Sequence, residues 1–512
     1  MPRGQKAIAR VEKKEDLAPS KMHHKRKRTG QVPIPNALTQ AERPDSDEQG
    51  DGRPPKRSKR AEPSLNKTST KPKMRAGVSK KPSSKTGQRI NRIPSDPLDV
   101  FVFGEGACGE LGLGSKIVKG QSLTDVMRPR LNKLLSSDDV GVVQITCGGM
   151  HAVALTKDNK ILTWGVNDLG ALGRATNVEE DEDDEFNPAE STPGPVDVSG
   201  LDPNVRWAQV AASDNASFAL TDEGRVYGWG TFRSSEGIMG FSKDIEVQKT
   251  PILIPDLKDI RQLATGNNHV LAVDGKGKVY AWGCGEQSQL GRKVLASHPK
   301  LALRPASIGA LPKRGVKAAQ VACGSYHSFA VDEQGRVYAW GLNTYAELGI
   351  SEKAGEDNAY HLKPRLVEAL KDYRVVSIAG GDHHSLAASD DGKLLTWGRI
   401  DGNQVGVHPE VFTADNTIYD ERGTARILKS PTVIPDIPRI VSVAAGTDHS
   451  FALTNDGKAY SWGFSSNGRT GQSTEDDIKI PTVIDGKAFG GKKLVVASAG
   501  GSFSILAVTQ NS

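Results

Sequence analysis

The sequence predicts an all-β fold: a seven-bladed β-propeller with four-stranded blades, preceded by a disordered basic tail. The first observation behind this prediction is a repeated phrase, an alternating apolar run that ends in an aromatic residue and a glycine. Successive phrases are 53 to 65 residues apart, which suits four strands and their loops. The closing glycines of the seven phrases are Gly104, Gly165, Gly230, Gly283, Gly341, Gly398 and Gly463.

The second observation is a small residue that lies 17 positions before six of these glycines. Between the two lie an apolar run, a turn such as Asp391-Gly392 and an alternating run such as 336–340. This pattern predicts a β-hairpin, and its constant spacing indicates one rigid unit in each blade. The small residues are Gly148, Ser213, Gly266, Gly324, Gly381 and Gly446.

The third observation is that both ends of the repeat region hold an incomplete repeat. The phrase at Gly104 has no hairpin partner before it, and the glycine-rich element at 499–503 has no phrase after it. We therefore expect the N- and C-terminal strands to share one blade, because this closure leaves no exposed sheet edge.

Residues 1–95 are expected to form the disordered tail and residues 96–512 the propeller. The tail carries 25 Lys and Arg against 9 Asp and Glu, a net charge of +16, whereas the whole chain has +6. Its composition offers too little apolar surface to offset the entropy lost on ordering. Basic runs of this kind are typical of nuclear localisation signals or of DNA contacts without sequence readout, and a merely solubilising tail is the alternative. The basic clusters comprise Lys13, Lys14, Lys25, Arg26, Lys27, Arg28, Lys56, Arg57, Lys59 and Arg60.

Several classes of function are not indicated by the sequence. No apolar run reaches 18 residues, so no membrane partner is expected. The four cysteines lack a C-x-x-C spacing, and neither a phosphate-loop motif nor a G-x-S-x-G elbow is present. We therefore expect no metal, no cofactor and no covalent catalysis.

A histidine recurs three positions after the small residue in five blades, and a tryptophan precedes the glycine of six phrases. Residues that repeat this often are interpreted as scaffold rather than as catalysts or a ligand cage. They are His151, His269, His327, His384 and His449, and Trp164, Trp229, Trp282, Trp340, Trp397 and Trp462.

The two positions between the small residue and the histidine vary from blade to blade. In a propeller they lie at strand entries around one mouth of the channel. Asp214, Asp382, His383 and Asp448 are therefore expected to form a polar ring on one face. Ordinary solvated loop residues are the alternative interpretation, but their gathering on one face favours a surface that binds a partner.

One phrase departs from the pattern. Six phrases have another glycine eight positions after the first, whereas Gly230 reaches its counterpart, Gly240, only after ten. A departure from a repeat is where function is most often added to a scaffold, so we predict a protruding wedge at 232–239. A tolerated loop insertion is the alternative.

Over roughly 96–512 the chain resembles the regulator of chromosome condensation family, in a fungal-type form. The motifs that carry this resemblance are Gly148-Gly149-Met150-His151, Trp164-Gly165-Val166-Asn167-Asp168-Leu169-Gly170 and Trp229-Gly230-Thr231-Phe232-Arg233, the last followed by two extra residues where the family has its β-wedge. The resemblance implies a guanine-nucleotide exchange factor for the nuclear GTPase Ran, associated with chromatin in the nucleus and acting without covalent chemistry. Implied partners are Ran in its GDP-bound and nucleotide-free forms, nucleosomes and DNA, and a nuclear import receptor. A non-catalytic interaction propeller of chromatin or of the ubiquitin pathway is the alternative.

By this resemblance the wedge presses against Ran near its phosphate-binding loop, with Phe232, Ile238 and Met239 inserted as a buried anchor. Asn268 stands where relatives can carry Asp, and the loop from Lys293 to Val316 is shorter than in animal relatives. The implied wedge residues are Phe232, Arg233, Ser234, Ser235, Glu236, Gly237, Ile238 and Met239. The implied GTPase-binding residues are Asp214, Asn268, Arg292, Asp382, His383 and Asp448.

Overall fold

The structure is a computed structural model that describes residues 88–118, 120–179, 181–311 and 315–510. Its sheets form seven blades, numbered here 1 to 7, plus one separate two-stranded hairpin. In the described part of the chain no helix is long and apolar enough to cross a membrane. The prediction of a seven-bladed, all-β propeller is confirmed.

Each blade is an antiparallel sheet of four strands, and blade 6 has a fifth. Blade 1 contains β1 (Leu98–Gly104), β2 (Val126–Leu131), β30 (Leu494–Ala499) and β31 (Phe503–Thr509). Blade 2 contains β3 (Val142–Cys147), β4 (His151–Thr156), β5 (Ile161–Gly165) and β6 (Gly194–Pro195). Blade 3 contains β7 (Trp207–Ala212), β8 (Ala216–Thr221), β9 (Val226–Gly230) and β12 (Gln248–Leu253). Blade 4 contains β13 (Ile260–Thr265), β14 (His269–Asp274), β15 (Val279–Gly283) and β16 (Ala306–Ser307).

Blade 5 contains β17 (Ala318–Cys323), β18 (His327–Asp332), β19 (Val337–Leu342) and β20 (Tyr360–Leu366). Blade 6 contains β21 (Val375–Gly380), β22 (His384–Ser389), β23 (Leu394–Arg399), β24 (Thr417–Tyr419) and β25 (Ala425–Val433). Blade 7 contains β26 (Ile440–Ala445), β27 (His449–Thr454), β28 (Ala459–Gly463) and β29 (Ile478–Val483). The hairpin pairs β10 (Phe232–Ser234) with β11 (Gly237–Gly240). Short helical segments lie between strands: α1 (Pro188–Ser191) and 3₁₀ turns at Lys133–Leu135, Pro299–Leu303, Glu368–Leu370, Pro409–Val411, Ser466–Gly468 and Gly486–Phe489.

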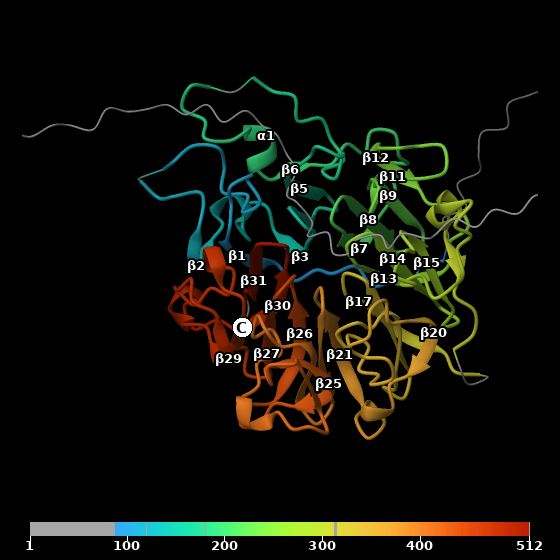
Figure 1. The fold of residues 1–512 in the computed structure, drawn as a ribbon. Coiled ribbons are helices and arrows are strands. Elements are labelled where there is room, and N and C mark those ends of the chain that lie inside the picture. The colour runs from blue at the N-terminus through green and yellow to red at the C-terminus, as the bar shows by residue number, and fades with distance from the viewer. Residues whose placement is uncertain (1–87, 119, 180, 312–314, 511–512) are drawn as a thin grey trace, which may run out of the picture. The chain divides into compact units, whose positions relative to one another are not determined.

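Blade 1 joins the two ends of the propeller. Its strand β1 pairs along its whole length with β31, from Leu98 opposite Thr509 to Gly104 opposite Phe503. Figure 1 shows the N-terminal and C-terminal strands side by side, and β30 packs in turn against β3 of blade 2. The shared closing blade predicted from the incomplete repeats is therefore confirmed, and the ring has no open edge between blades 7 and 2.

Five of the seven blade interfaces contain the same type of hydrogen-bond network, which is centred on the repeated histidine. The Nε2 atom of His151 in blade 2 lies 2.9 Å from Oγ of Ser217 in blade 3. Since Ser217 donates its only proton to the carbonyl of Ala171, the histidine must donate to the serine. Trp229 donates to the same carbonyl at 2.8 Å. Equivalent pairs are His269–Ser328, His327–Ser385, His384–Ser450 and His449–Ser504.

These histidines are buried and neutral, as expected of scaffold residues. Burial lowers the pKa of His151 to about 4 and that of His269 to about 3. The six repeated tryptophans are among the largest fully buried side chains. The interpretation of both residue types as blade packing is confirmed.

Two interfaces depart from this network. Between blades 3 and 4 the histidine position holds Ala216 and the serine position holds Val270, and between blades 1 and 2 these positions hold Phe503 and Ala152. At the second of these interfaces the aromatic ring of Phe503 stands in place of the histidine. At the first, Ala216 and Val270 belong to one buried hydrophobic cluster with Phe232 of the predicted wedge.

Candidate functional site

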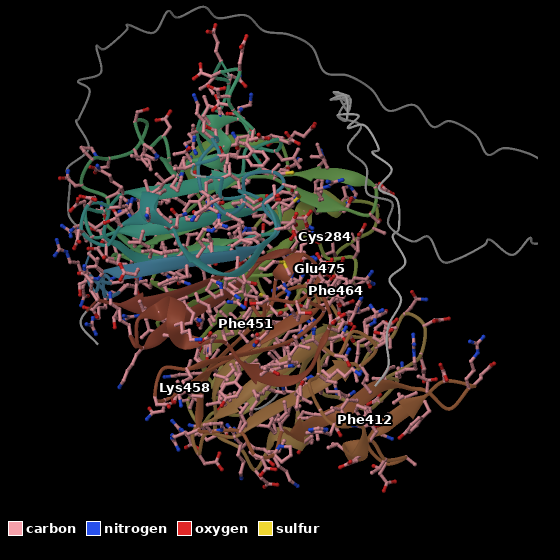
Figure 2. All side chains as sticks on the ribbon, turned by 90° about the vertical axis from the view of Figure 1, so that its left-hand side faces the viewer. Cys284, Phe412, Phe451, Lys458, Phe464 and Glu475 are labelled. Carbon is pink, nitrogen blue, oxygen red and sulfur yellow. The ribbon has the colours of Figure 1, made fainter. Side chains whose placement is uncertain are left out.

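The loops between the first and second strands of each blade lie side by side around one mouth of the channel. The backbone N–H of Asp214 donates to the carbonyl of Asn267 in blade 4 at 2.9 Å, and that of Asp382 donates to Thr447 in blade 7 at 3.1 Å. In the side view of Figure 2, Cys284 and Phe464, each directly after a third strand, lie toward one side of the molecule, and Lys458, in a turn before a third strand, lies toward the other. The predicted polar ring is therefore assembled at one mouth.

The carboxylates of this mouth are close enough to repel one another. Burial, and next the negative charge of Asp382, raises the pKa of Asp214 to about 7, while Arg233 opposes the rise. Burial also raises the pKa of Asp382, with a further contribution from Asp448, and Ser325 donates a hydrogen bond to its carboxylate. The mouth is thus an acidic site that would gain from a cationic or hydrogen-bond-donating partner.

Two mouth residues are held by side chains that the sequence interpretation did not single out. The Nδ1 atom of His383 lies 2.9 Å from Oε1 of the fully buried Glu347. Gln404 donates to Asp448 at 3.1 Å from the corresponding position of the next blade. These partners were detectable, because both stand two residues before the second glycine of their phrases, in register with each other.

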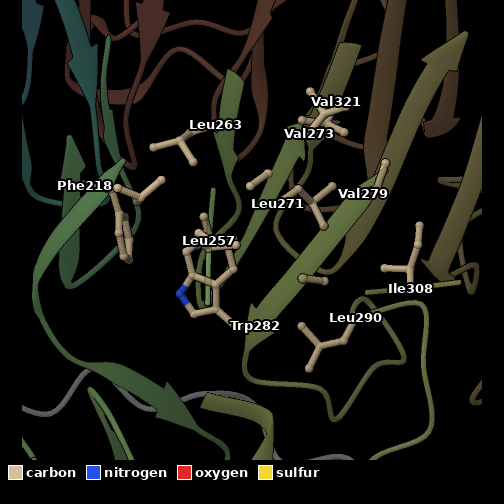
Figure 3. Packing of buried hydrophobic residues seen from close by; sticks show 14 of the residues in the cluster. Phe218, Leu257, Leu263, Leu271, Val273, Val279, Trp282, Leu290, Ile308 and Val321 are labelled. Atoms are coloured by element: carbon tan, nitrogen blue, oxygen red, sulfur yellow. The ribbon is translucent and has the colours of Figure 1, made fainter. Parts of the chain in front are cut away.

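The predicted wedge at 232–239 is the hairpin β10–β11, which follows the third strand of blade 3. Phe232 has no exposed surface and belongs to the core shared by blades 3 and 4. Its ring stacks on Phe218 and Phe241, at centroid distances of 6.1 and 6.4 Å, and Phe218 meets Trp282 edge-on at 5.9 Å. Figure 3 shows Phe218 and Trp282 on either side of this interface. Phe232 is therefore buried in the one hydrophobic cluster that contains Ala216 and Val270, the residues at the histidine and serine positions of this interface.

Two residues of blade 4 fasten the exposed part of the wedge. The side-chain oxygen of Asn268 accepts from the N–H of Arg233 at 2.8 Å. The carboxylate of Glu286 accepts from both the N–H and the hydroxyl of Ser235, at 3.0 and 2.8 Å. The hairpin is thus fixed to a second blade by three hydrogen bonds above a buried ring. Glu286 is a further residue that the sequence did not point out.

The exposed surface of the wedge differs from the expected anchor. Phe232 and Met239 are buried in the propeller and cannot insert into a partner without unpacking it, so that part of the prediction is wrong. Ile238 is 44% exposed, and Arg233, Ser235 and Glu236 are exposed as well. The exposed part of the hairpin is therefore a polar tip with one aliphatic side chain.

Two residues predicted to bind a GTPase have structural contacts within the propeller. The guanidinium of Arg292 donates to the carbonyls of Ala281, Ala302 and Arg304 at 3.3 to 3.5 Å, so it joins strand and loop within blade 4. Arg174 of blade 2 makes the same type of contact, which marks the position as scaffold. Asn268 binds the wedge backbone, and an aspartate there would also accept this hydrogen bond.

The basic clusters predicted to serve nuclear import and DNA binding lie outside the described residues. The described chain begins at Gln88, and residues 88–95, assigned above to the tail, include a stretch held by blades 3 and 4. The boundary between tail and propeller thus has structure of its own.

A closed seven-bladed propeller with a hairpin beside an acidic mouth is the class of protein that the fold and the site define. Residues 99–506 match the family described as RCC1-like domain, and the chain belongs to that family. It is 41% identical over 430 residues to "Guanine nucleotide exchange factor SRM1" of Saccharomyces cerevisiae, covering 80% of this chain and 87% of that protein.

Two solved structures share the fold and much of the sequence. One is "The Crystal Structure of Prp20p from Saccharomyces cerevisiae and Its Binding Properties to Gsp1p and Histones", with a TM-score of 0.75, 39% identity and coverage of 82% of this chain and 94% of that one. The other is "Crystal structure of Kap60 bound to yeast RCC1 (Prp20)", with a TM-score of 0.75, 38% identity and coverage of 86% and 97%.

Proposed function

We propose that this protein is a guanine-nucleotide exchange factor for the small GTPase Ran. The observation that carries the proposal is the wedge, a hairpin with a buried aromatic root and an exposed tip, placed next to an acidic mouth. Arg233 of the tip is near enough to Asp214 of the mouth to act on its pKa. The similarity to SRM1, which is named an exchange factor, supports the same conclusion.

The mechanism requires no covalent step. The propeller would bind the nucleotide-free GTPase more tightly than the nucleotide-bound form, and by reciprocity it would weaken nucleotide binding by the same factor. A thousandfold weakening corresponds to about 4 kcal/mol. Because its root is packed between two blades, the wedge can exert this effect without first losing conformational entropy.

The acidic mouth has a counterpart in the chemistry of a phosphate-binding loop. Such a loop holds a lysine and several backbone N–H groups that lose their anionic partner when the nucleotide leaves. We assign Asp214, Asp382 and Asp448 to that replacement, with His383 positioned by Glu347. Asn268 and Glu286 would act by holding the wedge.

The direct test is release of a fluorescent guanine nucleotide from purified Ran by catalytic amounts of the full chain. Acceleration by several orders of magnitude supports an exchange factor. Tight binding of Ran without acceleration would contradict exchange activity and indicate an interaction propeller that uses the same face.

The second part of the proposal concerns the N-terminal region: residues 1–95 carry the protein into the nucleus and onto chromatin. The support is their net charge of +16, together with the histones and Kap60 named for the yeast relatives. A reporter fused to the basic clusters should enter the nucleus. Alanine substitution of the clusters at 25–28 and 56–60 should prevent its import.

A further inference from the structure

The described chain begins with a short segment that is fixed to blades 3 and 4 at the end away from the wedge. The N–H groups of Ile90 and Asn91 both donate to the carbonyl of Asp222, at 2.7 and 3.0 Å. Arg89 forms an ion pair with the same aspartate at 3.2 Å. Asp222 directly follows β8, whose opposite end pairs with Gly230 just before the wedge.

Asn91 connects the two blades directly. Its side-chain amide donates to the carbonyl of Thr221, at the end of β8 in blade 3, at 2.9 Å. It also donates to the carbonyl of Ile260, at the start of β13 in blade 4, at 2.8 Å. Both amide protons are therefore used, one for each blade.

Ile90 replaces a side chain that other interfaces take from the propeller itself. In four other interfaces the stem of a Lys or Arg just before a first strand covers the turn glycine of the preceding blade; these residues are Lys317, Arg374, Arg439 and Lys493. Between blades 3 and 4 this position is Asp259, and the side chain of Ile90 lies against Gly224 instead. Arg261 also donates to the carbonyl of Ile90.

The contacts of Ile90 and Asn91, called the brace below, lie at the blade interface that carries the wedge. It lacks the histidine–serine network, and a single hydrophobic cluster runs through it from Ile260 at one end to Phe232 and Trp282 at the other. Packed cores transmit small displacements because they have few voids to absorb them. Loss of the brace would alter the spacing of the blades on which Phe232 depends.

We propose that Asn91 is a positioning residue for nucleotide exchange: together with Ile90 it holds blades 3 and 4 at the separation that the wedge requires. The part of this proposal that concerns nucleotide exchange rests on the proposed function. Residues 88–91 thereby belong to the working propeller rather than to a passive tail.

The test compares two full-length variants. Asn91→Ala removes the brace, and Asn159→Ala is the matched control. Asn159 also connects two blades through its side-chain amide, but these are blades 2 and 3. The amide donates to the carbonyl of Val205 at 2.8 Å and accepts from the N–H of Trp207 at 2.8 Å. Hydrogen–deuterium exchange of the Arg233 and Ser235 amides reports the wedge directly, and kcat and KM for nucleotide release from Ran report its action.

For Asn91→Ala we expect about tenfold faster exchange of the wedge amides and a threefold to tenfold lower kcat with a smaller change in KM. For Asn159→Ala we expect wild-type wedge protection and kcat despite a lower melting temperature. Unchanged wedge protection in Asn91→Ala, or an equal loss in Asn159→Ala, would overturn the proposal. The hydrogen-exchange arm needs no GTPase, so it decides this question even if the chain does not release nucleotide from Ran.

Discussion

The ring of Phe232 lies 6.1 Å from that of Phe218 at an interplanar angle of 26°, inside the blade interface where Ala216 replaces the repeated histidine. The root of the wedge is therefore part of the core of the propeller. Two roles are therefore divided within the hairpin. Phe232 anchors it in the core, and its exposed tip is the part that we propose contacts the GTPase.

Substitution of Phe232 by alanine should act on stability. Deleting a fully buried phenylalanine side chain costs about 3–5 kcal/mol of unfolding free energy, because contacts are lost and a cavity remains. Ile238→Ala, at the exposed tip, should change stability by less than about 0.5 kcal/mol. Urea unfolding of both variants tests this division, and equal stabilities would contradict it.

The histidine network should show a strong coupling with the glycine beside it. A Cβ atom at Gly324 would overlap the ring of His327, so Gly324→Ala should cost about 3 kcal/mol. Blade 3 already has both substitutions together. Ser213 stands at the position of the glycine, and Ala216 stands at the position of the histidine. In the double variant with His327→Ala the glycine substitution should cost much less. Additive losses in a double-mutant cycle would refute the steric explanation.

The carboxyl of Asp214 should make stability depend on pH in a defined direction. Its pKa is about 7 in the folded chain against an ordinary value of 3.8, so the folded state holds the proton more tightly. The resulting stabilisation is complete below about pH 4 and is lost as pH rises through 7. Asp214→Asn should flatten this slope and be the more stable protein at pH 8.

The same residue should make exchange more efficient at higher pH. A cationic group of the GTPase favours the ionised carboxylate, so binding near pH 7 should release a proton, measurable by calorimetry in buffers of different ionisation enthalpy. Asp214→Asn should lower kcat/KM about tenfold at pH 8 and less at pH 6. A pH-independent difference between the two proteins would mean that the charge of Asp214 has no role.

Much of the fold follows from the repeat, because a hairpin spacing kept six times leaves few alternatives. The blade number, the shared closing blade and the scaffold histidines were all predictable from it. The burial of Phe232 was not predicted, since the periodic pattern places a residue after Gly230 without showing which neighbour makes room for it. The signal was present in Ala216 and Val270, which depart from histidine and serine at one interface. The structural contacts of Arg292 were predictable as well, because Arg174 stands at the same position of its repeat and makes contacts of the same type.

The contacts of Asn91 could not be predicted from the sequence, for a different reason. Residues 88–95 are outside the repeats and continue the polar composition of the tail, so no periodicity identifies them. Their order comes from hydrogen bonds to main-chain carbonyls of Thr221, Asp222 and Ile260, and such acceptors leave no trace in the identity of the residues that supply them.

The most direct test of the central claim is stopped-flow release of fluorescent GDP from Ran by a wedge-tip variant, Arg233→Ala with Ile238→Ala. The control, Lys249→Ala with Leu253→Ala, removes one exposed cation and one exposed apolar residue from β12 of the same blade. If the tip acts on the GTPase, kcat should fall about a hundredfold in the first variant, at wild-type stability, and stay unchanged in the control. Wild-type release by the folded tip variant would contradict the claim that this hairpin drives nucleotide exchange.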